Sequence, residues 1–360
     1  MSDKLRLSWV DAAKGISILL VVMMYSAYSV GEDTGGIGFM HYIIAFATPF
    51  RMPEFFLISG LFLSHVIDRK WSAYVDRRVV HYLYFYALWM VIHIVFKVGI
   101  VTADPVGALS QIAYAVAQPY GVLWFIYVLA LVSAAAKLLA TLKIPQWVGL
   151  AGAAALQIAP VATGSYAIDQ FAEFFVFFYS GYVFAPMIFK FVESAMAAPF
   201  YALAFLALWA IGNGMLVFSP GYQMLPDHME MGLAALPGLR LVLALVGSLA
   251  LCTGAGLLSK LPAMNWLSWI GAHSIVIYLA FALPMSILRI VLLKLDLITD
   301  PGLLSLVVLI GATISPIILY ALIQWTGWGK FLFERPAWAH IPGTPGSLTP
   351  KSNPQQVPAE

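Results

Sequence analysis

The residues of this chain that can do acid–base or electrostatic chemistry stand inside apolar stretches, where charge is rare. Lys14, Arg51, Glu54, Glu173 and Arg240 each interrupt a long hydrophobic run. A charge at the centre of a lipid-embedded helix costs at least ~2.5 kcal/mol on insertion scales, so each of these side chains is a candidate functional residue. A carboxylate there can take a proton from a hydroxyl, and a cation can stabilise an anion or an oxyanion.

A structural interpretation stays open for each of these charges. Lys14 lies near the start of its apolar run and can extend its ammonium to the headgroups. Arg51 and Glu54 are three residues apart on one helical face and can neutralise each other. Glu173 and Arg240 can pair between helices or bind substrate. No group of histidines, acids and cysteine has metal-ligand spacing, so no metal site is predicted.

The amino-acid composition indicates whether the segments that hold these residues lie in water or in lipid. Of the 360 residues, 62% are hydrophobic and only 10% are charged, whereas soluble domains carry about 25% charged residues. A lipid bilayer must therefore surround most of the chain. The net charge of +2 is too small to indicate nucleic-acid binding. We predict an all-α integral membrane protein.

The spacing of apolar runs predicts about ten transmembrane helices in one bundle, since a span needs roughly 20 apolar residues. They are placed near 8–30, 39–66, 79–100, 120–141, 146–163, 168–190, 198–218, 232–258, 265–293 and 301–325. Residues 1–333 are the predicted transmembrane domain. The segment 334–360 is rich in Pro, Gly and Ser and is predicted to be a disordered cytoplasmic tail.

The distribution of lysine and arginine orients the bundle. With the N-terminus in the cytoplasm, most of them fall in cytoplasmic segments, as the positive-inside rule requires. The outside loops instead carry acids such as Glu32, Asp33, Asp104, Asp169 and Asp227. An even number of spans then places the C-terminus in the cytoplasm as well.

Five short motifs occur in an order that resembles the membrane acyltransferase 3 family. They are Asp11-Ala-Ala-Lys-Gly, Arg51-Met-Pro-Glu-Phe-Phe-Leu-Ile-Ser-Gly60, Gly121-Val-Leu-Trp-Phe-Ile126, Phe177-Phe-Tyr-Ser-Gly-Tyr182 and Trp269-Ile-Gly-Ala-His-Ser-Ile-Val-Ile-Tyr-Leu279. Each motif is weak alone. Together, in family order over roughly residues 5–330, they give a strong signal.

The resemblance implies transfer of an acyl group, often acetyl, from a cytoplasmic acyl-CoA to a hydroxyl of an extracytoplasmic sugar. Bacterial members acylate cell-envelope glycans, so the expected location is a bacterial inner membrane. The expected partners are acyl-CoA, a cell-envelope glycan or lipid-linked sugar, and the lipid bilayer. Acyl-CoA is a co-substrate, and no resident cofactor is expected.

The chain departs from the family pattern where histidines are usual. The arginine of the first helix is Lys14 here, and the histidine eleven positions later, the family's expected catalytic base, is Tyr25. A histidine before Met-Pro is Arg51, and one after the Tyr-Leu motif is Phe281. A phenol is a weak base unless a nearby cation stabilises the phenolate, which Arg51 can do if the first two spans pack closely. Glu54 is the other candidate base.

These considerations assign the candidate site. The predicted catalytic residues are Tyr25, Glu54 and Arg51, and the predicted substrate-binding residues are Lys14, Trp124, Glu173 and Arg240.

Further side chains can contribute to substrate binding. The Arg69-Lys70 and Arg77-Arg78 pairs, with Lys14, can bind CoA phosphates. Tyr28 and Tyr127, with Trp124, can stack on a sugar. Positive-inside topology and the interfacial aromatic belt also account for these residues.

Two other functions remain open. The missing histidines favour a catalytically silent relative that binds or translocates an envelope component. An unrelated secondary transporter is the third hypothesis, although no two related halves are visible. Convergence of Tyr25, Arg51 and Glu54 on one cavity above Lys14 would favour the enzyme. A continuous water pathway without a CoA-sized opening would favour transport.

Overall fold

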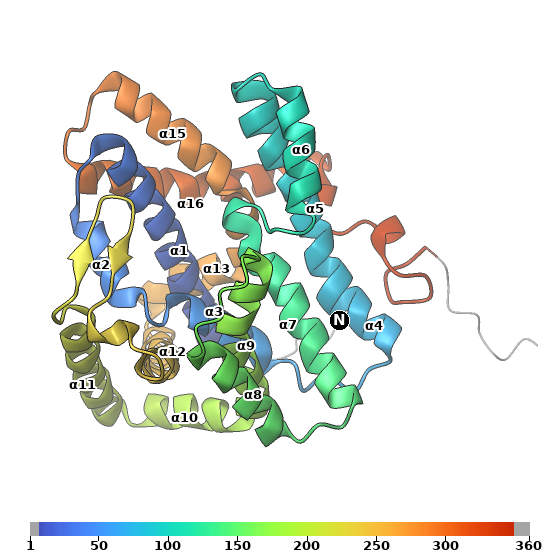
Figure 1. The fold of residues 1–360 in the computed structure, drawn as a ribbon, viewed down its shortest axis with the longest axis vertical. Coiled ribbons are helices and arrows are strands. Elements are labelled where there is room, and N and C mark those ends of the chain that lie inside the picture. Colours follow the sequence, from blue (N-terminus) through green and yellow to red (C-terminus); the bar gives the residue numbers. More distant parts are fainter. Residues whose placement is uncertain (1–6, 349–360) are drawn as a thin grey trace, which may run out of the picture. The chain divides into compact units, whose positions relative to one another are not determined.

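The computed structural model of the chain describes residues 7–348. Its helices and its one hairpin are drawn in Figure 1. By their contacts, the described residues fall into two compact units. The first unit comprises the described residues up to Leu63, Pro145–Ala162 and Ala172–Ala321. The second comprises Ser64–Ile144, Thr163–Phe171 and the described residues from Leu322 onward.

The first unit is almost entirely helical. Its helices are α1 (Ser8–Thr34), α2 (Phe39–Ala47), α3 (Arg51–Leu61), α8 (Gln146–Ile158), most of α9 (Tyr166–Val183), α10 (Ala185–Ala197), α11 (Pro199–Val217), α12 (Leu239–Leu258), α13 (Asn265–Ala272), α14 (Ser274–Ala280), α15 (Ala282–Leu295) and most of α16 (Pro301–Thr326). One hairpin pairs β1 (Gln223–Met224) with β2 (Met229–Glu230) in antiparallel orientation.

Helix α12 lies at the centre of the first unit, and Figure 1 views it along its axis. It packs against α1, α3, α10 and α11. The buried positions of α12 include Gly247, Ser248, Cys252 and Ala255, all of them small. Small side chains allow helices to approach closely in lipid, where apolar burial alone does not drive their association.

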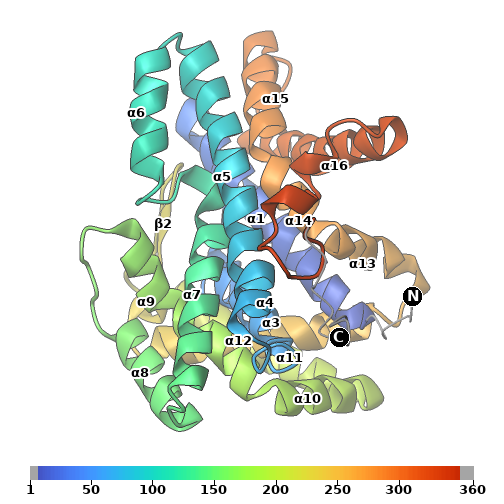
Figure 2. The same ribbon diagram turned by 90° about the vertical axis from the view of Figure 1, so that its right-hand side faces the viewer.

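Helices α1 and α13 touch through their backbones (Figure 2). A Cβ atom added at Gly15 would lie 2.3 Å from the carbonyl oxygen of Leu267. One added at Gly271 would lie 1.7 Å from the carbonyl oxygen of Asp11. A side chain at either position would force the two helices apart, so this contact fixes the half of α1 that carries Lys14.

The second unit is organised around one long helical rod, Trp71–Val101 (Figure 2). The rod comprises α4 (Trp71–Val75), the π-helical turn η1 (Asp76–Val80), α5 (His81–Ile94) and the π-helical stretch η2 (Val95–Val101). Around it pack α6 (Pro105–Ala115), which folds back on η2, and α7 (Trp124–Thr141). Segments of π-helix are rare and are frequent at functional sites.

The C-terminal part of the chain packs on this rod. Tyr84 Oη donates a hydrogen bond to the carbonyl of Phe331 (3.0 Å), and Trp89 Nε1 donates one to the carbonyl of Leu332 (2.9 Å). Of the tail predicted to be disordered, 334–360, the part from 349 lies outside the described residues. The part before it includes the short 3₁₀ turn η7 (Ala337–Ala339).

The helical membrane class is confirmed, while the number of spans is not. Within residues 7–348, six helices are long and apolar enough to cross a membrane. The number of candidate spans rises to eight if each of two bent helix pairs is counted as one span. The pairs are α9 with α10, bent by 75°, and α14 with α15, bent by 56°. Pro186 and Pro284 follow these bends closely and explain them, because proline disfavours helix in the residue before it and removes a backbone donor.

The two remaining predicted spans, 39–66 and 146–163, contain only short helices. The 13 residues of α8 are fewer than the roughly 20 that a span needs. The segment 39–66 is divided into α2 and α3 by a turn at Thr48–Phe50 that contains Pro49. Because α3 begins at Arg51, this break places the guanidinium at a helix N-terminus rather than inside a helix.

Candidate functional site

A buried carboxylate and a buried hydroxyl meet where α3 packs on α1. Glu54 and Ser17 are both fully buried, and Ser17 Oγ donates a hydrogen bond to Glu54 Oε2. The second oxygen, Glu54 Oε1, has no partner among the described residues. Lys14, one turn before Ser17 on α1, lies close enough for its charge to act on this carboxylate.

Arg51 lies at the other end of the same interface. Its side chain is buried, and its charge interacts with the phenols of Tyr28 and Tyr25. Its Nε and Nη1 atoms have no hydrogen-bond partner among the described residues, and no ion pair joins it to Glu54 there. The neutralising pair that the spacing allowed is therefore not formed. Since Arg51 meets the Tyr25 end of α1 and Glu54 meets the Lys14 end, α3 runs antiparallel to α1.

The positions Lys14, Ser17, Tyr25 and Tyr28 share one face of α1. With 3.6 residues per turn, their spacings of 3, 8 and 3 residues place them within a sector of about 80°. The three catalytic candidates and Lys14 therefore lie along a single helix interface.

The three positions at which the resemblance expects histidine lie together. The rings of Tyr25 and Phe281 are 5.6 Å apart, and Arg51 interacts with Tyr25. None of the three positions holds a histidine, and the nearby His41 uses both ring nitrogens in other hydrogen bonds. The Gly38 amide donates to His41 Nδ1 (3.2 Å), so the proton is on Nε2, which donates to the carbonyl of Pro226 (3.0 Å).

His41 thereby ties α2 to the β1–β2 hairpin. The turn of this hairpin also carries Asp227 and His228, and a hydrogen bond from the His228 ring lowers the pKa of the Asp227 carboxyl. Sequence reasoning missed both Ser17 and His41. A serine in an apolar helix and a histidine beside aromatic residues give no signal that separates them from packing residues.

Glu173 on α9 and Arg240 on α12 are brought together as an ion pair. Each charge therefore already has a partner. The Glu173 side chain is 26% exposed and the Arg240 side chain 41%, so neither charge is deeply desolvated. The pairing between helices that the sequence left open is formed. A role in binding substrate stays a prediction.

Trp124, the remaining substrate-binding candidate, belongs to the second unit. It is the first residue of α7, is mostly buried, and packs edge-on against Tyr166 with ring centroids 6.2 Å apart.

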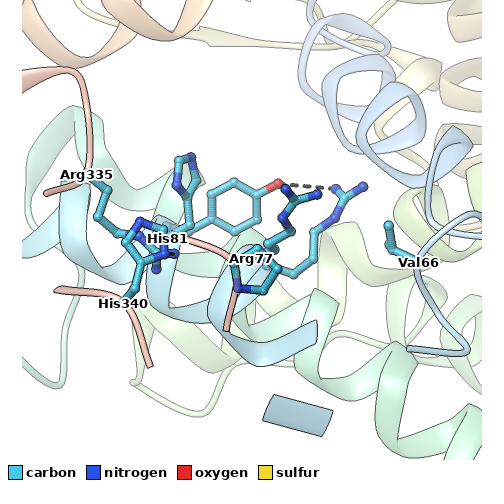
Figure 3. Close-up of a pocket in the computed structure, with 8 residues that line it drawn as sticks. Val66, Arg77, His81, Arg335 and His340 are labelled. Atoms are coloured by element: carbon cyan, nitrogen blue, oxygen red, sulfur yellow. Dashed lines mark hydrogen bonds between the residues drawn. The ribbon is translucent and has the colours of Figure 1, made fainter. Parts of the chain in front are cut away.

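The second unit also contains a pocket of ≈ 350 Å³ with a strongly basic lining (Figure 3). We call it the basic pocket. Its lining includes Arg77, Arg78, His81, Tyr82, Arg335 and His340. The first four come from η1 and the start of α5, and the last two come from the segment around η7 (Figure 3). The predicted Arg77-Arg78 pair thus lines a pocket of ligand size, whereas Arg335 and His340 were not anticipated.

Comparison with known proteins identified one family that matches this chain. The model of the acyltransferase 3 family, described as an acyltransferase domain, matches residues 7–321. Searches of curated proteins and of solved structures gave no match. The family match spans most of the chain and includes all five sequence motifs. The chain therefore belongs to the acyltransferase 3 family and is a membrane acyltransferase.

Proposed function

We propose that the chain is an O-acyltransferase that moves an acyl group, expected to be acetyl, from cytoplasmic acyl-CoA to a hydroxyl of an extracytoplasmic glycan. The proposal rests on two side chains in the first turn of α3. There, among residues 7–348, Glu54 keeps one carboxylate oxygen without a hydrogen-bond partner, and Arg51, one turn away, keeps two nitrogen donors without partners. A base and a cation are the two parts that acyl transfer to a hydroxyl requires.

The reaction follows from these groups. The acceptor hydroxyl attacks the thioester carbonyl while Glu54 accepts its proton. The carbonyl oxygen becomes an oxyanion, which Arg51 stabilises together with the positive end of the α3 dipole. The intermediate collapses with cleavage of the carbon–sulfur bond, and the CoA thiolate takes the proton back from Glu54. Ser17 holds the carboxylate in place through its hydrogen bond.

Tyr25 is the second candidate base. It stands at the position where the resemblance expects the catalytic histidine, and Arg51 is the cation that would stabilise its phenolate. In this alternative Glu54 is a positioning residue. If Glu54 is the base, Glu54→Gln abolishes acyl transfer. If Tyr25 is the base, Tyr25→Phe abolishes it.

The donor side of the proposal is supported by the basic pocket. Acyl-CoA carries a nucleotide with several phosphates, and arginines bind phosphate through two parallel hydrogen bonds. Arg77 and Arg78 line the pocket. The charge distribution of the sequence assigns them to the cytoplasmic side, where acyl-CoA is made. The same pattern supports both termini in the cytoplasm. The family resemblance supports a bacterial inner membrane as the location.

The test measures ester-linked acyl groups on envelope glycans. Cells carry the intact gene, a deletion, Glu54→Gln or Tyr25→Phe, and membrane levels of each protein are determined in parallel. Glu193→Gln and Tyr201→Phe are matched controls, because both side chains are exposed. Deletion is expected to remove an ester. Loss again in only one of the two site variants identifies the base.

An unchanged ester content after deletion would overturn the proposal. The chain would then be a silent relative that binds or translocates an envelope component. Equal loss in the control variants would instead indicate that the assay reports protein level.

A further inference from the structure

The basic pocket is built from two parts of the chain that are far apart in sequence. Arg77, Arg78, His81 and Tyr82 belong to the rod of the second unit, while Arg335 and His340 lie past residue 321, where the family match ends. We propose that the segment 335–345 is the second wall of a nucleotide-binding site and that Asp76 anchors this wall. The inference rests on the proposed acyl-CoA donor.

Asp76 holds the segment at four points. Arg335 Nη2 donates to Asp76 Oδ2 (2.6 Å), and Arg335 Nη1 donates to the main-chain carbonyl of Asp76 (2.7 Å). The Ile341 amide donates to Asp76 Oδ1 (2.8 Å), and His340 Nδ1 lies 3.0 Å from Asp76 Oδ2. Asp76 and the Arg335 guanidinium are both almost completely buried. The segment is therefore fixed to η1 by a desolvated, charge-assisted network.

The hydrogen bonds that anchor the segment also keep the Asp76 carboxylate from repelling an anionic ligand. Both Asp76 oxygens are occupied by donors from the segment, so the carboxylate does not face the pocket as a free negative charge. Arg77 is exposed, and Arg78 only bonds weakly to Tyr82 Oη (3.3 Å). The Arg335 guanidinium is buried and bonded to Asp76, so Arg77 and Arg78 supply the guanidinium groups that a ligand can reach. The lining thus offers guanidinium donors to a ligand that carries several negative charges.

The rings of the pocket favour a nucleotide over other polyanions. His81 and Tyr82 come from the rod and His340 comes from the segment, so the two walls each contribute a flat side chain (Figure 3). Bases stack on aromatic rings and on guanidinium planes, whereas a lipid headgroup has no flat face to match them. A volume of ≈ 350 Å³ suits one small-molecule moiety. The ligand class is a nucleotide with more than one phosphate.

The first test is a binding measurement with full-length protein in nanodiscs of neutral lipid. Titration calorimetry with CoA and with adenosine 3′,5′-bisphosphate gives the Kd. We expect His340→Ala and Arg335→Lys to weaken binding at least about tenfold, the loss of one contact to a charged group. Lys330→Ala is the matched control, because it removes a cation from the same region without touching the pocket.

A second readout needs no variant. Hydrogen exchange of the Ile341 amide, which is bonded to Asp76, should slow when the bisphosphate binds. An unchanged Kd in both pocket variants, or an Ile341 amide indifferent to ligand, would overturn the inference. Protection by phosphatidylglycerol vesicles without any nucleotide binding would also overturn it, in favour of a headgroup site.

The outcomes separate this inference from the proposed function. If the unaltered protein binds neither ligand, the acyl-CoA donor is wrong and the inference falls with it. If CoA binds, and only Arg77→Ala weakens it, the donor stands while the role of segment 335–345 is refuted.

Discussion

Arg51 offers a test in which stability and function move in opposite directions. Its guanidinium is buried, and two of its nitrogens lack partners among the described residues. It also begins α3, where the helix dipole is positive and disfavours a cation. An unsatisfied buried polar group costs about 1–3 kcal/mol, and arginine is ~3 kcal/mol worse than an apolar residue inside a membrane span. Arg51→Met keeps the aliphatic packing and removes these penalties.

We therefore expect Arg51→Met to stabilise the fold by about 2–3 kcal/mol. This is half of the summed penalties, because Arg51 lies at a helix end and not at the centre of a span. At roughly 2 °C per kcal/mol for a chain of this size, the melting temperature rises by about 4–6 °C. Thermal unfolding in detergent, followed by tryptophan fluorescence, measures the shift. Acyl transfer in the same variant should fall at least about a hundredfold, the loss expected for one oxyanion donor.

Two comparisons sharpen this prediction. Arg51→Lys keeps the charge, so it should give no gain in melting temperature. Arg289→Met removes an arginine that is paired, 3.1 Å from Asp33 and 3.0 Å from the carbonyl of Ser29, and should lower the melting temperature. If Arg51→Met melts lower than the unaltered protein, Arg51 supports the fold and the reasoning is refuted.

Three further predictions follow from contacts in the first unit. Ser17→Ala removes the partner of a buried carboxylate and should cost about 1–3 kcal/mol, measured by thermal unfolding, with reduced acyl transfer. Gly271→Ala forces α13 away from α1 and should cost about 1–3 kcal/mol or more, seen as a lower melting temperature and less protein in the membrane. Glu173→Gln and Arg240→Gln should show a coupling below about 1 kcal/mol in a double-mutant cycle, since the pair is partly exposed.

Each of these has a result that would contradict it. For Ser17, the cost should disappear when Glu54→Leu is already present, and a cost that persists would assign Ser17 to packing alone. For Gly271, the control is Gly254→Ala, where an added Cβ meets nothing within 4 Å and helix propensity predicts a gain of about 0.5–1 kcal/mol. Equal losses in both would refute the close-contact argument. A strong coupling of Glu173 with Arg240 would mean that their network is larger than the pair.

The class of the protein was readable from the sequence because it depends on composition. Charged residues inside apolar runs were also visible in the sequence, and the structure brings Tyr25, Arg51 and Glu54 to one helix interface. Whether Arg51 and Glu54 pair was not readable, since both outcomes fit a spacing of three. The deciding contact is Ser17, which is 37 residues from Glu54 in the chain.

The breaks in the helices were harder to place than the helices themselves. Pro49, Pro186 and Pro284 were visible, yet proline occurs inside membrane helices as well, as Pro316 does within α16. The helix α6 was missed although Asp104 caps it through the Gly107 amide (2.8 Å) and Pro105 starts it. Its surroundings lack a long apolar run, so a search for spans passes over it.

The backbone contact between α1 and α13 also sets the order in which this protein can be assembled. Helix α1 leaves the ribosome long before α13, because Gly271 is synthesised about 250 residues after Gly15. At ~5–20 residues per second, the wait is about 12–50 s. During this time the half of α1 with Lys14 must rest against lipid, the insertion machinery or a temporary neighbour. Biogenesis of the site is therefore completed only after α13, in the ninth predicted span, has been synthesised.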